Sequence, residues 1–468
     1  MTTVETERFG TARLAEIGLP SFAAAATRPE LPAARHAERV AALRERMRAR
    51  GYDAIVVFAD REHSASISFL TGFDPRFEEA ILIVGTADDE PAILVGNECW
   101  GIAGAAPLPM RRHLLQDLSL PSQPRDRSRP LSELLHDEGV RRGGRIGAVG
   151  WKTYADRATL EVPSFLVDAL RAIVGPDGVV ENATDLLMDP RDGLRVINDV
   201  DQLAYFEWAA TQTSDGVRRV IEGMRPGMTE REAVRLLGWD GTPLSCHLML
   251  TAGPRATFGL LSPGDRPIER GDRFTVAFGI WGALNCRAGF VVEDAAELPS
   301  PIRDYVDRLV GPYFAAVAEW YAALRVGLPA GVLHDIVARR LGDPFFGIFL
   351  NAGHQIHLDE WVNSPIFAGS TIPLASGMAF QVDIIPATGT DYFTTNIEDG
   401  IALADDALRE QLAAVYPDAW ARIGARRAFM ADALGIELHP DVLPFSNLPA
   451  YLPPFLLRPD RAMTIRGS

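Results

Sequence analysis

The stretch MAFQVDIIPATGTDYFTTNIEDGIALA, residues 378–404, contains two apolar segments joined by a connection rich in threonine. The length and composition of these segments, MAFQVDII and NIEDGIALA, predict two strands. Each strand carries a carboxylate among apolar neighbours, Asp383 in the first and Glu398 in the second. Because a buried carboxylate is costly unless it is paired or used in chemistry, the two strands predict a polar site inside the fold.

Just upstream, the segment NAGHQIHLDEW, residues 351–361, supplies two histidines and an acidic pair. A histidine beside carboxylates can transfer protons near neutral pH. The alternative is a hydrogen-bond network around His354 that only stabilises the fold. The catalytic candidates are His354, His357, Glu360, Asp383 and Glu398.

Farther upstream lie two more apolar segments that contain glycine or proline, SCHLMLTAGP at 245–254 and GDRFTVAFGIWGALNCRAGF at 271–290. The second of these predicts strands. Before them, residues 194–238 predict two helices, and Thr229 with Glu232 three residues later forms a capping box at the start of the second. A further helix pair over 302–342 suggests an internal pseudo-repeat. Strands beside helices indicate a compact α+β domain.

The first half of the chain alternates short apolar strands with helices, which predicts an α/β domain ending near residue 190. A helix is expected to stop at Gly51. The last sixty residues predict one long helix and an apolar tail that packs on the body. The predicted organisation is an N-terminal arm, an α/β domain, a catalytic-type α+β domain and a helical extension with its tail, over residues 1–36, 37–190, 191–406 and 407–468.

Composition restricts the classes of partner. The 468 residues carry a formal net charge of −16, which argues against nucleic acid or an anionic membrane as the main partner. Three widely spaced cysteines, Cys99, Cys246 and Cys286, predict neither a disulfide framework nor a CxxC metal site. No apolar run approaches the roughly 20 residues of a membrane span, and the polar N-terminus does not predict a signal segment. We therefore expect a cytoplasmic protein.

Taken together, the order and spacing of these segments over about residues 37–405 resemble the creatinase/aminopeptidase P/prolidase family of M24 peptidases. The segments that carry the resemblance are the helix opening LRVINDVDQLAYFEWA, the RPGMTEREA turn, the TAGP and RGD punctuation, the GH dipeptide, the SGM turn and the IED strand. The resemblance implies a two-domain α/β protein, with an N-terminal creatinase-type domain and a C-terminal pita-bread domain. It also implies a homodimer.

Metallopeptidases of that family hold two divalent ions with two aspartates, one histidine and two glutamates. Carried over position by position, these ligands correspond to Ala277, a position at or next to Cys286, His354, Asp383 and Glu398. Two cations about 4 Å apart need bridging carboxylates, and alanine offers none. The sequence therefore predicts no metal ion, or one divalent ion held by His354, Asp383 and Glu398.

The family's other catalytic histidines also differ, because their positions hold Leu260 and Trp361. Arg76, in the segment GFDPRFEEA, is similar to the arginine by which creatinase-like dimers reach the partner's active site. Its guanidinium could bind a substrate carboxylate, or it could form a surface salt bridge. Cys286 is expected as a buried small residue rather than a nucleophile, and Arg287 as a surface or ion-pair residue. The substrate-binding candidates are Arg76, His247, Cys286 and Trp361.

These observations predict a hydrolase that cleaves a C–N bond in a small amino-acid-derived or dipeptide-like substrate, with little or no dependence on metal. Two alternatives stay open at this stage. One is a peptidase of the Xaa-Pro type that uses a single metal ion. The other is a non-catalytic pita-bread protein that binds a ligand or a partner chain. In each enzymatic case the expected partner is a small-molecule substrate.

Overall fold

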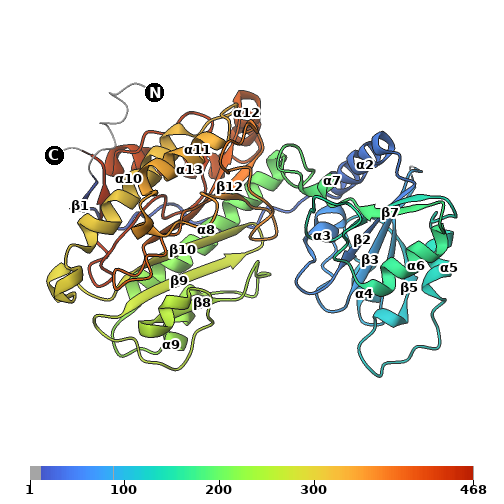
Figure 1. Cartoon of the computed structure of the whole chain (residues 1–468), viewed down its shortest axis with the longest axis horizontal. Helices are drawn as coiled ribbons and strands as arrows, with labels where there is room; N and C mark the ends of the chain where they lie inside the picture. The colour runs from blue at the N-terminus through green and yellow to red at the C-terminus, as the bar shows by residue number, and fades with distance from the viewer. Residues whose placement is uncertain (1–11, 88, 467–468) are drawn as a thin grey trace. The chain divides into compact units, whose positions relative to one another are not determined.

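The structure of the protein is a computed structural model that describes residues 12–87 and 89–466 (Figure 1). Contacts divide the chain into two compact units. The smaller unit is Glu30–Arg195, and the larger comprises the described residues before Glu30 together with those from Val196 onward. The residues around 30–36, predicted as part of the arm, thus lie in the smaller unit. This two-domain α/β architecture is the fold class that the sequence predicts.

The smaller unit is built on a mixed six-stranded sheet in the order β5-β4-β3-β2-β6-β7. Its central strands are almost completely buried, as their near-continuous apolar sequences predict. Helix α2 ends at Gly51, which adopts the left-handed conformation with a φ of 69° and confirms the predicted stop. The strands are β2 Ala54–Ala59, β3 Ala80–Gly85, β4 Ala92–Val95, β5 Arg111–Leu114, β6 Arg145–Val149 and β7 Val179–Asn182, and the helices are α2 Ala33–Arg50, α3 Ala65–Thr71, α4 Cys99–Ala103, α5 Leu131–Asp137, α6 Ser164–Val174 and α7 Asp185–Met188.

The larger unit contains a seven-stranded antiparallel sheet in the order β11-β12-β13-β10-β9-β8, with β14 paired to β13. Helix α8 packs along β9, β10 and β13 (Figure 1). The capping box of Thr229 and Glu232 at the start of α9 is present as predicted. The strands are β8 Met249–Ala252, β9 Arg273–Ile280, β10 Ala283–Phe290, β11 His354–Gln355, β12 Ala379–Asp383, β13 Asn396–Leu403 and β14 Val442–Pro444, and the helices are α8 Val200–Gly223, α9 Glu230–Val234, α10 Gly311–Ala323 and α11 Gly331–Leu341.

Strand register aligns one residue from each of five neighbouring strands. Cys286 lies opposite both Ala277 and Glu398, Asp383 lies opposite Glu398, and Met249 lies opposite Ala277. Directly opposed residues project to the same face of a sheet. The five residues Met249, Ala277, Cys286, Glu398 and Asp383 therefore form one continuous line across the sheet, which we call the central row.

The opposite face of the same strands anchors the C-terminal tail. Arg287 and Asp399 follow Cys286 and Glu398 and so point away from the central row. The Arg287 guanidinium donates to both carboxylate oxygens of Asp399 at 2.9 and 3.0 Å and to the Tyr451 carbonyl at 2.7 Å. Asp399 also accepts from the Ala450 amide at 2.8 Å. Of the two alternatives expected for Arg287, a surface residue or an ion-pair residue, the structure shows the ion pair, and both side chains are buried.

The C-terminal region is packed on the body, as predicted from its apolar tail: Tyr451, Leu452, Phe455 and Leu456 are buried. The single long helix predicted here is wrong. Two helices form instead, α12 (Asp406–Val415) and α13 (Pro417–Phe429), because Pro417 cannot continue a helix but is well suited to start one. Strand β15 (Arg461–Thr464) pairs antiparallel with β1 (Arg13–Glu16), which lies in the predicted arm.

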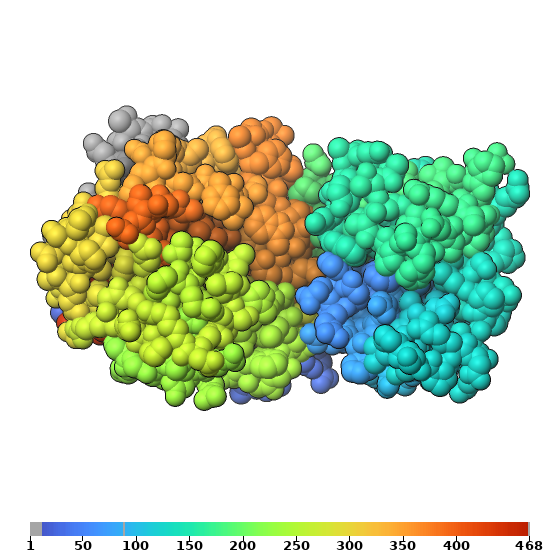
Figure 2. Space-filling view, turned by 60° about the horizontal axis from the view of Figure 1, so that its bottom comes forward, coloured from blue at the N-terminus to red at the C-terminus, as the bar shows by residue number. Residues whose placement is uncertain are grey.

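In the space-filling view, the surface of the larger unit is formed by segments coloured from green to red (Figure 2). It is therefore assembled from parts of the chain that are far apart in sequence. Within the described residues, no helix combines the length and the apolar character needed to cross a bilayer.

We expect Asp399→Asn to destabilise the larger unit by about 3–5 kcal/mol, because the buried Arg287 guanidinium would lose its counter-charge. Urea denaturation followed by tryptophan fluorescence measures the change. Asp391→Asn is a suitable control, since it removes an ion pair with Arg273 in which the aspartate is largely exposed, and it should leave the urea midpoint nearly unchanged. Equal midpoints for the two variants would contradict the prediction.

Candidate active site

Local backbone constraints place His354 at the edge of the sheet, in the two-residue strand β11. The preceding Gly353 has a φ of 106°, and a Cβ atom there would lie only 2.9 Å from the Gln381 carbonyl oxygen. The Trp320 indole fixes the same turn by donating to the Ala352 carbonyl at 2.9 Å. A glycine before His354 is therefore required by the fold. Pairing of His354 with Gln381 directs the imidazole to the face that carries the central row.

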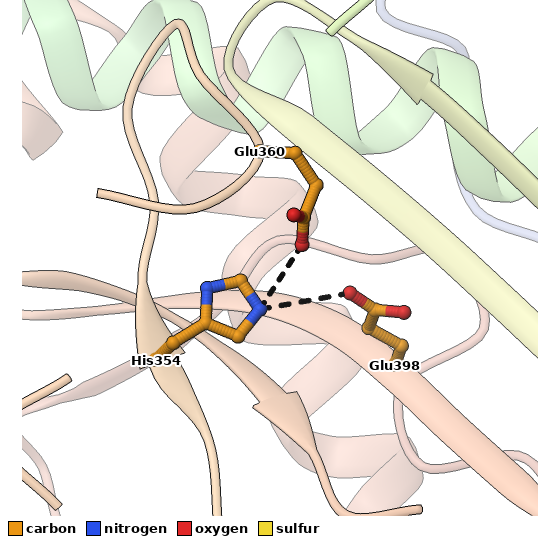
Figure 3. A group of neighbouring side chains, drawn as sticks. All are labelled: His354, Glu360 and Glu398. Atoms are coloured by element: carbon orange, nitrogen blue, oxygen red, sulfur yellow. Dashed lines mark ion pairs between the residues drawn. The ribbon is translucent and has the colours of Figure 1, made fainter. Parts of the chain in front are cut away.

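Three carboxylates surround one nitrogen of His354. Its Nε2 lies 3.1 Å from Glu360 Oε1, 3.8 Å from Glu398 Oε1 and 3.9 Å from Asp383 Oδ2. Figure 3 shows Glu360 and Glu398 approaching this nitrogen from different elements, Glu360 from the loop after β11 and Glu398 from β13. The Trp361 ring stacks on the imidazole with a centroid separation of 4.1 Å and an interplanar angle of 13°. We call His354, Glu360, Asp383 and Glu398 the His354 cluster.

The electrostatics of the His354 cluster favour shared protons. Burial by itself lowers the pKa of His354, but the hydrogen bond and charge of Glu360, together with Glu398 and Asp383, raise it to about 10. Burial raises the pKa of Asp383 to about 6, although His354 opposes this shift. Burial and the charge of Asp383 raise the pKa of Glu398 well above its usual range. Near neutral pH the imidazole is therefore protonated, and Asp383 is mostly ionised.

The other end of the central row is apolar. Met249, Ala277 and Cys286 pack with Leu284 in one cluster, and Cys246 packs against it. Burial raises the pKa of the Cys246 thiol to about 12, helped by the charges of Glu360 and Glu398, and raises that of Cys286 well above its ordinary value. Both thiols are thus protonated at neutral pH and behave as apolar groups, which agrees with the expectation that Cys286 is not a nucleophile.

The other predicted site residues have contacts of their own. His357 is buried, and its ring meets Phe206 edge-on at a centroid distance of 5.2 Å. His247 is exposed, and its Nε2 lies 2.7 Å from the Leu260 carbonyl oxygen. Arg76 lies in the smaller unit and donates to both oxygens of Asp74 at 2.9 and 2.8 Å. Trp361 is the substrate-binding candidate that directly contacts His354.

Solvent reaches the face that carries the central row. All five residues of the row retain 6–7% of their surface. Their immediate neighbours on the opposite face, Leu250, Val276, Phe278, Arg287, Ile397, Asp399 and Val382, retain at most 3%. The row itself is thus slightly more accessible than the opposite face of the same strands, whereas Leu284, Ala288 and Gln381, which share its face, retain at most 3%.

Sequence reasoning missed Asn396 and Cys246. Asn396 lies two residues before Glu398 and so shares its face, and its Nδ2 donates to Cys286 Sγ at 3.3 Å. Strand alternation in NIEDG could have identified it. Cys246 precedes strand β8 and carries no periodic signal that would place it beside Ala277 and Cys286.

The residues present suit a single cation better than a pair. One ligand atom each from His354, Glu360 and Glu398 lie within 4.8 Å of one another, and such a set can hold one divalent ion. Asp383 stands beside this set rather than within it, whereas Glu360 was not among the predicted ligands. At the next positions of the row, Cys286 and Ala277 offer no carboxylate for a second ion.

Comparisons with known proteins agree with this architecture. Residues 39–163 match the model of the Creatinase/Prolidase N-terminal domain. A curated relative, the uncharacterized peptidase YqhT of Bacillus subtilis (strain 168), is 26% identical over 231 residues, which span 46% of this chain and 62% of the relative. The chain thus covers less than two thirds of that relative's length.

Solved structures show the same fold over most of the chain. The prolidase from Pyrococcus horikoshii OT3 has a TM-score of 0.59 at 16% identity and covers 78% of this chain and 95% of its own. The X-Pro aminopeptidase from Thermotoga maritima MSB8 has a TM-score of 0.60 at 16% identity, with the same coverage of the two chains. Dipeptidase PepE from Mycobacterium ulcerans has a TM-score of 0.58 at 17% identity and covers 80% of this chain and 95% of its own.

We expect Glu360→Gln to lower the pKa of His354 from about 10, because Glu360 is the strongest of the groups that raise it. NMR titration of the imidazole resonances in the metal-free protein measures this shift. Asp359→Asn provides the control, since it neutralises the adjacent carboxylate of the same loop. A His354 pKa that is unchanged in Glu360→Gln, or lowered equally in both variants, would contradict the geometry of the His354 cluster.

Proposed function

Since the chain is related to the creatinase, prolidase and aminopeptidase P family, we propose that it is a hydrolase that cleaves a C–N bond in a small amino-acid-derived or dipeptide-like substrate. The observation that carries this proposal is the His354 cluster, in which one buried imidazole meets three carboxylates on a face that solvent reaches. Clusters of acids and bases with strongly shifted pKa values are typical of catalytic sites.

Hydrolysis of a C–N bond requires a base that accepts a proton from water and an acid that donates one to the leaving nitrogen. Asp383 suits the first role, because its pKa is about 6 and its Oδ1 has no hydrogen-bond partner among the described residues. Protonated His354 suits the second role. As the C–O bond forms and the C–N bond breaks, the water proton passes to Asp383 and the imidazolium proton passes to the departing amine.

Glu360 and Glu398 hold the imidazole in position for this exchange. Glu360 approaches Nε2 from the loop after β11 and Glu398 approaches it from β13. The stacked Trp361 ring limits rotation of the imidazole. After the amine leaves, the proton on Asp383 can return to His354, whose nitrogen is 3.9 Å away. The cycle then closes without net change in the protonation of the His354 cluster.

A second candidate, hydrolysis by a peptidase of the Xaa-Pro type with one metal ion, is favoured by the same ligand geometry. His354, Glu360 and Glu398 would hold that ion, which when bound would supply Lewis-acid polarisation of the substrate carbonyl. In that state Asp383 would keep its role as base toward water. A homodimer and the binding of a substrate carboxylate by Arg76 remain proposals that follow from the family likeness.

The pH dependence of kcat/KM in the presence of EDTA tests the proton-transfer roles. We expect activity to rise through about pH 6, as Asp383 ionises, and to fall through about pH 10, as His354 loses its proton. The assay uses a panel of amino-acid amides, X–Pro dipeptides and amidines. Activity that falls between pH 5 and 8 would rule out Asp383 as the base.

We expect His354→Ala to lower kcat/KM by at least about 100-fold, which is the usual contribution of a positioned acid. The matched control is His334→Ala, which removes a partly exposed histidine of α11. Circular dichroism would confirm that both variants are folded. Full turnover by His354→Ala would exclude the proposed mechanism.

Elemental analysis with calorimetric titration of Mn²⁺ or Zn²⁺ distinguishes the two candidate functions. We expect at most one equivalent to bind, and Glu360→Gln to weaken that binding about 10-fold or more, since it removes one charged ligand. Activity that is restored only by the ion would favour the metal-dependent candidate. Two tightly bound equivalents would contradict the apolar character of Ala277 and Cys286.

A further inference from the structure

We propose that the apolar end of the central row is a substrate subsite, and that the preferred ligands carry a positive charge at one end and a small aliphatic group at the other. The charged end would lie against the His354 cluster, and the aliphatic group would lie on Ala277, Cys286 and Met249. This inference rests on the proposed function, because it assigns the class of substrate to the same site. It also assigns a role to residues that the mechanism leaves unused.

Register makes the two ends of the row contiguous. Glu398 of the His354 cluster lies directly opposite Cys286 of the apolar end, and Cys286 lies directly opposite Ala277. Side chains at directly opposed positions have Cβ atoms about 5 Å apart. Ala277 is two such steps from Glu398, about 10 Å, so a ligand whose charged end lies between Glu398 and Cys286 needs about four carbon atoms to contact Ala277, and a longer chain to contact Met249. The spacing favours small ligands over long peptides.

The exposure of the row supports a ligand on both ends. Met249, Ala277 and Cys286 retain the same 6–7% exposure as Asp383 and Glu398, so solvent reaches the apolar end as well as the charged one. An apolar floor that only filled the core would be expected to be as buried as the opposite face of the same strands. Water makes few hydrogen bonds to an apolar surface. An aliphatic group that displaces this water buries apolar area, which favours binding.

The charge of the His354 cluster determines the charge of the ligand group that lies against it. Three carboxylates face a single imidazole, so the cluster favours a cation over an anion when its acids are ionised. Glu360 retains 27% side-chain exposure, which makes it the member of the cluster that an incoming ligand meets first. An ammonium or amidinium group provides several N–H donors for these oxygens.

Asn396 lies at the junction of the two ends. Its Nδ2 donates to Cys286 Sγ at 3.3 Å, which fixes the orientation of the amide. Its Oδ1 is buried and has no hydrogen-bond partner among the described residues. A buried acceptor without a partner is costly, and an N–H group of the ligand would satisfy it. The position therefore suits a ligand whose polar nitrogen lies between Glu398 and Cys286.

Binding of n-alkylamines to the metal-free protein tests the subsite without requiring turnover. Isothermal titration with methylamine, ethylamine, propylamine and butylamine should give affinities that rise about fourfold for each added methylene. The n-alkyl carboxylates propionate, butyrate and valerate carry similar chains with the opposite charge. We expect them to bind at least about 10-fold more weakly than the amines of equal length.

Two substitutions test whether the increase in affinity per methylene arises at the apolar end of the central row. Cys286→Ser is nearly isosteric but polar, and we expect it to reduce the gain per methylene to less than about twofold. Ala277→Leu fills the space and should abolish the gain while methylamine binding changes little. Cys99→Ser, the same change at a buried cysteine of the smaller unit, is the matched control and should leave the series unchanged.

An amine series whose affinity does not depend on chain length, or one that is unaffected by Cys286→Ser, would overturn the subsite. If the panel of amides and amidines is nevertheless hydrolysed in a His354-dependent manner, the proposed function stands without it. A chain-length gradient in a protein that hydrolyses no member of the panel would instead overturn the hydrolase and leave the subsite in place. Failure to bind any of the amines would overturn the subsite directly.

Discussion

Antiparallel pairing of the strands β8, β9, β10, β13 and β12 is the constraint on which the rest of the structure depends. Because opposed residues share a face, the register of Cys286 against Ala277 and Glu398 decides which side chains meet. A shift by one residue would bring Arg287 and Asp399 to the site and would bury Glu398 in the opposite layer. The composition of the site is thus a property of the sheet, and Glu360 and Trp361 complete it from a loop.

The two faces of these strands carry different kinds of residues. On one face, several carboxylates lie around a single imidazole; burial raises the pKa values of Asp383 and Glu398, and the imidazole opposes this shift. On the other face, Arg287 and Asp399 form a fully satisfied buried pair that also holds the tail. The candidate chemistry and the anchoring of the tail therefore lie on opposite faces of the same strands.

Much of this architecture could be predicted from the sequence, because strand alternation and helix caps are local signals. The apolar runs gave the strands, Gly51 and Thr229 marked helix ends, and the carboxylates Asp383 and Glu398 stood out among apolar neighbours. Pairing between distant strands is not local, so the alignment of Met249 and Cys246 with Cys286 could not be predicted. The burial of Arg287 was missed for the same reason, since its partners come from residues 399 and 448–451.

The pairing of β1 with β15 has a consequence for how the protein is made. Residues 13–16 are synthesised about 445 residues before their partners at 461–464. At ordinary rates of translation, this separation corresponds to a wait of roughly 20–90 s. The smaller unit is one continuous segment, Glu30–Arg195, so all of its residues are available for folding during that time. The two-stranded sheet of β1 and β15, by contrast, can form only after residues 461–464 have been synthesised.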